Sequence, residues 1–254
     1  MDFARVEHHG AVATITLNKP ERGNALCLQM VEELISCLAQ AQSTSRLVVF
    51  RGEGRNFCAG LDLSALDGET DATLLLRFVR IETLRNSIET SPVETLCVGQ
   101  GAAYGAGADL FAACDHRLCL ADTRFAFPGV AFGIVLGTSR LASLVGAPAA
   151  QSILLARRTV GADQAMSIGL ATDHVESQNA AMDRVAELAA NAGRLPADAV
   201  ARLRQVIRQD RSDADLAALT RSASAPGLRD RIQAYSATLK SAAPLSAGGV
   251  SVPG

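Results

Sequence analysis

The feature that most limits the fold of this chain is a repeated order of strand, glycine-rich turn, helix and strand in its middle third. A short buried strand over Thr95–Gly99 enters a run of glycines, a compact helix follows over Ala108–Cys114, and another strand follows over His116–Leu120. The alternation continues through Phe125 to a helix from about Ser139. This order predicts an α/β fold with mainly parallel strands, because such strands are joined by helical crossovers.

The N-terminal part extends this pattern. Residues 11–17 alternate in polarity and predict a strand that is hairpinned with Phe3–His8. Asn24 is expected to cap a helix, Leu47–Phe50 to form a buried strand, and residues 73–90 to form a second helix.

Beyond Val175 the spacing of apolar residues becomes purely helical. A chain of 254 residues suits one large domain or a core with a modest appendage. We therefore expect a core over residues 1–190 and a helical region over 191–254, which would pack on a neighbouring subunit. Its last residues, Ala242–Gly254, are rich in Gly, Ser and Pro and are expected to fray.

Charge and composition exclude several classes of protein. The net charge of −2 argues against a nucleic-acid binder, which needs a basic face. No apolar run approaches the ~20 residues that span a membrane, and nothing at the N-terminus marks the chain for secretion. Six cysteines scattered through apolar stretches predict reduced core thiols, so we expect a cytoplasmic protein.

Common catalytic signatures are absent from the sequence. It has no P-loop, no dinucleotide-binding glycine pattern and no serine nucleophile elbow. Cys114, His116 and Cys119 lack a second ligand pair, so core thiols are favoured over a metal site and no metal is expected. Cys58 lies in a tight turn, but no base for a thiol nucleophile is identifiable near it.

Two segments stand out together, residues 55–63 and 99–110. In each, a strand runs into small residues that leave backbone N–H groups free near the start of a helix. Two such groups converging on one point would form an oxyanion hole, which stabilises charge developing on a carbonyl oxygen. The alternative is that the glycines only let helices pack closely on strands. The residue types alone do not favour the oxyanion hole over the packing role, or the reverse.

With these motifs in view, the sequence resembles the crotonase, or enoyl-CoA hydratase/isomerase, superfamily. The resemblance runs from Val12–Leu26 through Phe57–Leu63, the glycine run and Cys114-Asp115 to Ala165–Ala171. It implies a spiral of ββα units and a C-terminal helical part that forms trimers, often paired into hexamers. It also implies a role in fatty acid metabolism, with an acyl-CoA substrate and no cofactor beyond its CoA moiety.

The resemblance also implies roles for individual residues. The thioester oxygen would be held by the backbone N–H groups of Leu61 and Ala106. The CoA moiety would contact Arg22, Cys58, Ala59 and Gly60.

Hydratases of the family add water with two glutamates, and the resemblance places Asp109 at the first of these positions. The second falls near Gly129, which carries no carboxylate. Because one carboxylate can both remove and return a proton, double-bond isomerisation is easier to derive here than hydration. Phe78, Glu82, Gly105 and Gly129 are expected in the substrate pocket, with Glu82 as a second-acid candidate.

Three alternatives remain open at this level. Asp109 could be an acid stabilised by the helix dipole without catalysis. The protein could be a catalytically silent paralogue that binds CoA thioesters. It could also be a decarboxylase or hydrolase built on the same fold.

Overall fold

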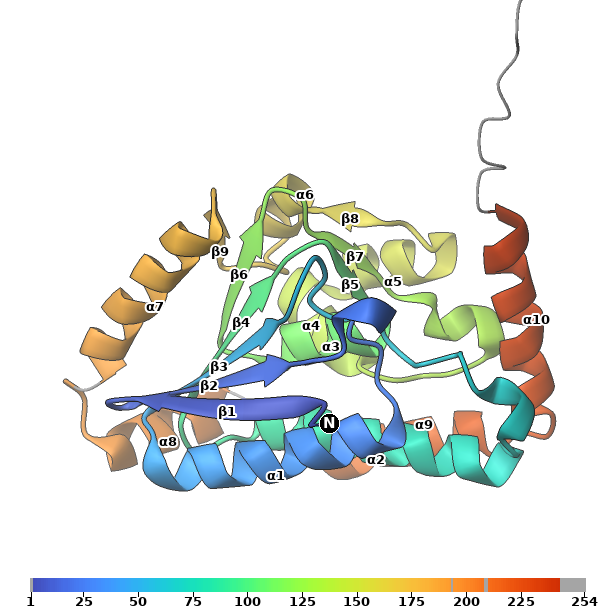
Figure 1. Ribbon diagram of the computed structural model, residues 1–254, viewed down its shortest axis with the longest axis horizontal. Helices are drawn as coiled ribbons and strands as arrows, with labels where there is room; N and C mark the ends of the chain where they lie inside the picture. Colours follow the sequence, from blue (N-terminus) through green and yellow to red (C-terminus); the bar gives the residue numbers. More distant parts are fainter. Residues whose placement is uncertain (1, 193, 208–209, 243–254) are drawn as a thin grey trace, which may run out of the picture.

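A six-stranded sheet forms the centre of the molecule in the computed structural model, which describes residues 2–192, 194–207 and 210–242. The strand order is β1-β2-β3-β4-β6-β9, and all neighbours are parallel except the β1–β2 hairpin (Figure 1). The strands are β1 (Ala4–His9), β2 (Val12–Leu17), β3 (Leu47–Gly52), β4 (Glu94–Gly99), β6 (His116–Leu120) and β9 (Asp173–Val175). The expected α/β class and hairpin are confirmed.

A second, three-stranded sheet stands beside the first. It contains β5 (Ala102–Tyr104), β7 (Arg124–Ala126) and β8 (Val160–Gly161). A single bridge between Cys58 and Ala103 joins it to the turn after β3.

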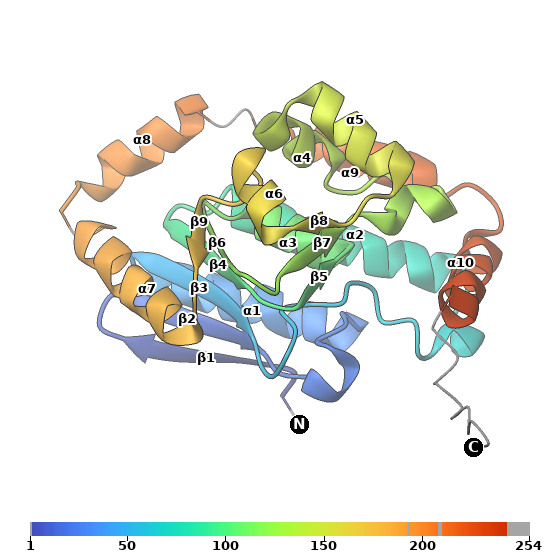
Figure 2. The ribbon, with the colours of Figure 1, turned by 90° about the horizontal axis from the view of Figure 1, so that it is seen from above.

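Helices cover the sheets and complete the molecule (Figures 1 and 2). The α-helices are α1 (Leu28–Thr44), α2 (Asp71–Glu89), α3 (Ala106–Ala113), α4 (Thr138–Val145), α5 (Ala147–Ala156), α6 (Ala162–Ser167), α7 (Gln178–Ala192), α8 (Ala197–Ile207), α9 (Ser212–Ala223) and α10 (Leu228–Ala242). Short 3₁₀ helices in the described residues are η1 (Pro20–Arg22), η2 (Leu66–Gly68) and η3 (Pro128–Phe132). No helix in these described ranges is both long and apolar enough to cross a membrane.

The central strands are apolar on both faces because each face is covered. Val48 and Phe50 of β3 pack in the main core with α1 and α3, whereas Leu47 and Val49 pack against α7. A continuous apolar run is what a doubly covered parallel strand requires. The main core extends to the helices that carry the candidate site.

The segment around Asn24 differs from its expected role. Helix α1 begins at Leu28, and Asn24 is a buried residue with a left-handed backbone (φ 57°). Its side-chain amide donates to the backbone oxygens of Glu53 and Asn56, at 3.0 and 2.8 Å. Asn24 therefore stabilises the turn after β3 through these hydrogen bonds and does not cap a helix.

The last two described helices, α9 and α10, pack against the core. Leu219 of α9 and Ile232 of α10 share an apolar cluster with Phe78 of α2 and Phe132 of η3. The expected boundary at residue 190 stays a prediction, but α9 and α10 are continuous with the core through this cluster. Residues 243–254, most of the expected frayed tail, lie outside the described residues.

Candidate active site

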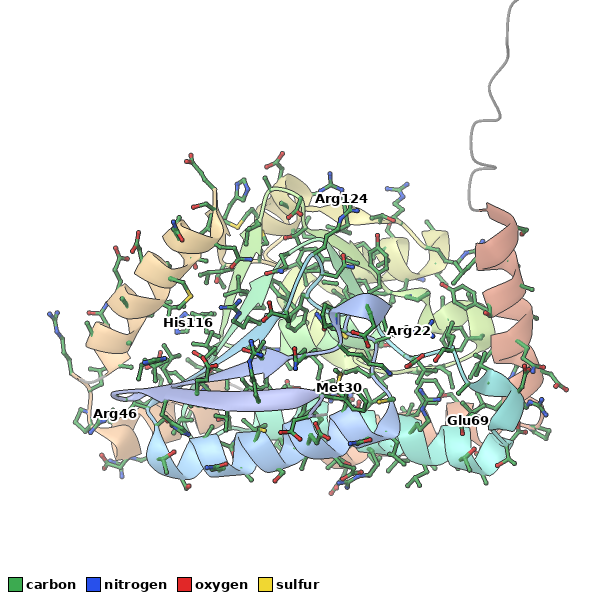
Figure 3. All side chains as sticks on the ribbon, viewed as in Figure 1. Arg22, Met30, Arg46, Glu69, His116 and Arg124 are labelled. Atoms are coloured by element: carbon green, nitrogen blue, oxygen red, sulfur yellow. The ribbon has the colours of Figure 1, made fainter. Side chains whose placement is uncertain are left out.

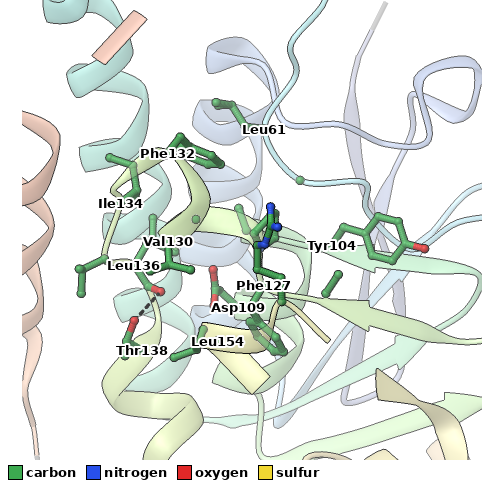
Figure 4. A pocket seen from close by; sticks show the side chains of 18 of the residues that line it. Leu61, Tyr104, Asp109, Phe127, Val130, Phe132, Ile134, Leu136, Thr138 and Leu154 are labelled. Atoms are coloured by element: carbon green, nitrogen blue, oxygen red, sulfur yellow. Dashed lines mark hydrogen bonds between the residues drawn. The ribbon is translucent and has the colours of Figure 1, made fainter. Parts of the chain in front are cut away.

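A cavity of about 1050 Å³ lies between the turn after β3, the start of α3 and the helices α5 and α10. Its wall is mostly apolar, with Leu61, Phe127, Leu136 and Leu154 among the side chains in Figure 4. Asp109 is its only carboxylate among the described residues. A concave apolar site with few polar groups is typical of a small-molecule pocket.

The peptide bond between Gly60 and Leu61 is oriented by a backbone hydrogen bond to its carbonyl oxygen. The Gly60 carbonyl accepts a hydrogen bond of 2.7 Å from the Leu26 backbone N–H. Because C=O and N–H point in opposite directions across a trans peptide, the Leu61 N–H is directed away from Leu26. In the described part of the chain, this N–H donates no hydrogen bond to a backbone oxygen.

The peptide bond between Gly105 and Ala106 is also oriented by a backbone hydrogen bond to its carbonyl oxygen. The Gly105 carbonyl accepts from the Asp109 backbone N–H at 3.0 Å, in the first turn of α3. Ala106 is the first residue of that helix, so its own N–H has no partner within the helix. This N–H lies at the positive end of the helix dipole.

Two glycines let these turns approach each other. A Cβ on Gly60 (φ 89°) would lie 2.6 Å from Tyr104 O and 3.6 Å from Ala106 N. A Cβ on Gly107 would lie 2.3 Å from Cys58 O. Close packing at these glycines and an oxyanion hole are therefore compatible explanations, because the close packing brings the Leu61 and Ala106 segments together.

Asp109 lies in the first turn of α3 and is only 6% exposed. Figure 4 shows its carboxyl group among Phe127, Val130 and Leu136. Burial raises the pKa of Asp109 well above its ordinary value, because a low-dielectric site disfavours the charged form. A carboxyl group whose pKa is raised in this way is a stronger base than an ordinary aspartate, and it can also return the proton that it accepts.

A buried ion network lies on the α2 side of Asp109. Arg85 donates to Glu82 through Nη2 at 2.7 Å and Nε at 3.0 Å, and its Nη2 also lies 3.1 Å from Asp215 of α9. The positive charge of Arg85 lowers the pKa of Asp109 and the negative charge of Glu82 raises it, but the effect of burial is larger than either.

Eight of the expected site residues line the main cavity. They are Ala59, Gly60, Leu61, Phe78, Gly105, Ala106, Asp109 and Gly129. A Cβ on Gly129 would lie 3.1 Å from Ile134 O, so a larger side chain there would be in tight contact with the backbone of the following loop. Their chemical roles stay predictions.

Three expected site residues lie outside the main cavity, and two of them, Glu82 and Cys58, are fully buried. The prediction that Glu82 lines the substrate pocket is wrong, because its fully buried carboxylate pairs with Arg85 between helices. The side chain of Cys58 is also fully buried, behind the turn. Burial raises its pKa to about 12, so it is a neutral thiol at physiological pH and not an activated nucleophile.

Arg22 lines a second, smaller cavity of about 450 Å³. This cavity adjoins the main one, because Ala59, Leu61 and Leu63 line both. Figure 3 shows Arg22 on η1, beyond the end of β2. Arg22 is therefore placed to contact one end of a long ligand whose other end occupies the main cavity.

Sequence reasoning missed Gly137, Arg77 and the α10 residues Tyr235 and Leu239. Tyr235 and Leu239 line the main cavity from a helix more than 120 positions after Asp109, and no sequence pattern signals that contact. Gly137 lies against the catalytic candidate, since a Cβ there would lie 2.1 Å from Asp109 Oδ1. Arg77 had a usable signal, because it shares a helical face with Leu74 and Ile81, where a charge is unexpected.

A family model described as "Enoyl-CoA hydratase/isomerase" matches residues 7–225 of the chain. A Mycobacterium tuberculosis (strain CDC 1551 / Oshkosh) protein named probable enoyl-CoA hydratase echA6 is 38% identical over 165 residues. That match covers 63% of this chain and 66% of the relative, just under two thirds of its length. A probable enoyl-CoA hydratase of Bacillus subtilis (strain 168) is 32% identical over 187 residues, which cover 70% of this chain and 71% of that protein.

Solved structures agree with this assignment. An enoyl-CoA hydratase/isomerase candidate from Bordetella parapertussis superposes with a TM-score of 0.90 at 42% identity, over 92% of this chain and 98% of the other. An enoyl-CoA hydratase from Bacillus halodurans shares the fold, with a TM-score of 0.81 at 19% identity over 91% of this chain and 99% of the other. The family match over most of the chain and this likeness of fold lead to one conclusion: the chain belongs to the enoyl-CoA hydratase/isomerase family of the crotonase superfamily.

Proposed function

We propose that this protein is an acyl-CoA enzyme that moves a double bond in an enoyl-CoA thioester. The Leu61 and Ala106 N–H groups hold the thioester oxygen, and Asp109 transfers the proton. The observation that carries this proposal is that Leu61, Ala106 and the buried Asp109 line one cavity, while the Leu61 and Ala106 N–H groups donate to no backbone oxygen among the described residues.

The proposed reaction balances without a redox step. For a 3-enoyl thioester, the Asp109 carboxylate removes a proton from the α-carbon, and the electron pair delocalises onto the thioester oxygen as a dienolate. The two N–H groups stabilise that charge. The protonated Asp109 then returns the proton to the γ-carbon, which leaves the double bond between the α- and β-carbons. No cofactor besides the CoA moiety of the substrate takes part.

Isomerisation is favoured over hydration because of the groups that line the cavity. Addition of water requires one group to activate the water and another to supply the α-proton. Asp109 is the only carboxylate among the described lining residues, and glycine occupies position 129, where the family resemblance places the second acid. A proton shift between two carbons needs only the one acid.

The adjoining smaller cavity supports a binding mode for the CoA moiety. We infer that Arg22 contacts its phosphate-bearing end, with the backbone of residues 58–60 beside it. The acyl chain then extends into the apolar part of the main cavity, towards Phe78 and Leu136.

The test is turnover on 2-enoyl-, 3-enoyl- and dienoyl-CoA thioesters, followed by chromatography of the products. The proposal expects double-bond migration and no net hydration. Saturable binding without turnover on any substrate would instead indicate a silent thioester-binding protein. Release of CO₂ from a malonyl-type thioester, or of free CoA, would indicate a decarboxylase or a hydrolase.

We also propose that the protein self-associates as a homotrimer or a pair of trimers through α8. Leu203, Val206 and Ile207 on this helix are 56%, 83% and 71% exposed. Large apolar side chains gathered on one exposed helix are typical of an interaction surface. Replacing both Val206 and Ile207 by Asp is expected to convert the assembly to monomers in sedimentation velocity experiments.

Leu76→Asp is the control, because it places an aspartate on an exposed leucine of another helix (49% exposed). The control is expected to keep the wild-type sedimentation coefficient. A double variant at positions 206 and 207 that sediments like the wild type would exclude α8 from the interface.

We further propose that the enzyme acts in the cytoplasm. The support is chemical: all six cysteines are free thiols, as in a reducing compartment.

A further inference from the structure

We propose that Arg77 is a positioning residue for the oxyanion site, holding the Leu61 peptide at the orientation that the thioester oxygen requires. This inference rests on the proposed function. Arg77 lies on α2, is only 5% exposed, and does not line the cavity itself.

The bonds of Arg77 go to the main chain on both sides of the Leu61 turn. Its Nη2 donates to Asp62 O at 2.8 Å and to Leu26 O at 3.1 Å, while Nη1 donates to the Glu69 carboxylate at 2.8 Å. Figure 3 labels Glu69 just before the start of α2. The guanidinium group is planar and presents its donors in a rigid fork, so three acceptors are held at fixed relative positions.

These acceptors belong to the frame that orients Leu61. Residues 60–62 and Leu26 are joined by two backbone hydrogen bonds, Leu26 N–H to Gly60 O at 2.7 Å and Asp62 N–H to Leu26 O at 3.1 Å. Arg77 ties the Leu26 and Asp62 carbonyls to a single cation. Without it, the turn would keep its two backbone bonds and its apolar contacts with Leu74 and Phe78, but the Leu26 and Asp62 carbonyls would lose their hydrogen bonds to α2.

Comparison with Arg85, two turns further along α2, shows how specific this arrangement is. Arg85 is fully buried as well, but the bonds of its guanidinium group go to the side chains of Glu82, Glu89, Asn86 and Asp215. Arg85 therefore links side chains within α2 and connects α2 to α9 through Asp215. Two of the three bonds of Arg77 go to backbone oxygens that flank a proposed oxyanion donor, which a structural ion pair alone does not require.

The experiment compares Arg77→Met, Arg77→Lys and Arg80→Met. Arg80 lies on the same helix and pairs with Glu32 at the surface, so it is the matched control. Two quantities are measured: kcat and KM for the isomerisation, and the carbonyl stretching frequency of a bound saturated acyl-CoA that carries ¹³C at the thioester carbon. Hydrogen bonds to the thioester oxygen lower that frequency, and the saturated chain does not isomerise.

We expect Arg77→Met to lower kcat about 10- to 100-fold, because small displacements of catalytic groups have effects of this size. KM should change less than about threefold, since most binding contacts remain. The frequency shift on binding should shrink in Arg77→Met, less so in Arg77→Lys, and stay at the wild-type value in Arg80→Met.

The outcomes separate this inference from the proposed function. If the wild-type protein shows no frequency shift, the oxyanion site itself is wrong and the role of Arg77 is overturned with it. A wild-type shift that Arg77→Met retains in full overturns the role of Arg77 alone. If Arg77→Met does not fold, the same readout on Arg77→Lys decides: a reduced shift supports the inference, and an unchanged one overturns it.

Discussion

Replacing Asp109 by asparagine is expected to lower kcat for double-bond migration by about 10²- to 10⁴-fold, the usual contribution of a positioned acid–base group. Asparagine has nearly the same shape but cannot accept and return a proton. Binding of the thioester should persist, because the Leu61 and Ala106 N–H groups and the apolar wall are unchanged. Steady-state kinetics and calorimetric titration with a saturated acyl-CoA measure the two effects separately.

Asp163→Asn is the matched control for this variant. Asp163 also lies in the first turn of a helix, α6, but it is exposed and does not line the cavity. The control is expected to keep wild-type kinetics. If Asp109→Asn keeps wild-type turnover as well, Asp109 is an acid stabilised by the helix dipole and not the proton carrier.

The raised pKa of Asp109 also determines how activity depends on pH. The carboxylate is the base, so kcat/KM should rise with pH through the pKa of Asp109, well above the ordinary value of 3.8. A pH profile of kcat/KM from 3 to 9 measures this ascending limb. A limb centred near 3.8 would show that burial does not perturb the group.

The contribution of Asp109 to the free energy of unfolding should fall as the pH rises, whereas kcat/KM rises. Because the folded protein binds the Asp109 proton more tightly than the unfolded chain, this contribution to stability is complete below the unfolded pKa of about 3.9 and is lost as the pH rises through the folded pKa. Asp109→Asn has no such loss. Its Tm should therefore rise relative to the wild type with increasing pH, by roughly 2–4 °C for each 1 kcal/mol of stability.

Replacing Gly60 by alanine is expected to lower kcat by about 10²- to 10³-fold, the effect of losing one oxyanion donor. The backbone of Gly60 has φ 89°, and an added Cβ would lie 2.6 Å from Tyr104 O, so the turn must move away from α3. That movement separates the Leu61 and Ala106 N–H groups. The unfavourable backbone conformation should also cost about 1–3 kcal/mol of stability.

Gly10→Ala separates the two effects of the Gly60 variant. Gly10 also has a positive φ, 59°, but no atom lies within 4 Å of an added Cβ. It should lose some stability in thermal unfolding and keep wild-type kcat. Wild-type kcat in a folded Gly60→Ala variant would show that the distance between the two turns does not control the chemistry.

The sequence predicted those parts of the fold that depend on local patterns. The apolar run at Leu47–Phe50 predicted the buried strand β3, and the apolar spacing of residues 73–90 predicted most of α2. The two glycine-containing segments contain Leu61 and Ala106, whose backbone N–H groups donate to no backbone oxygen among the described residues. Each of these inferences needs only neighbours along the chain.

The incorrect or missing predictions all concern contacts between distant segments. Asn24 was expected at a helix start, but its amide binds oxygens about 30 residues away. Glu82 was expected in the pocket, but helical periodicity does not reveal that α3 and α9 cover its face. Tyr235 completes the cavity wall only because α10 packs beside η3, which no spacing in the sequence encodes.

The central claim is that two backbone N–H groups from separate turns hold one thioester oxygen. A crystal structure of the Asp109→Asn variant with a bound 3-enoyl-CoA tests it most directly. We expect the thioester oxygen within about 2.7–3.1 Å of both Leu61 N and Ala106 N, with the amide introduced at position 109 beside the α- and γ-carbons. A thioester oxygen bound elsewhere, or either N–H group donating to a protein oxygen in the complex, would contradict the claim.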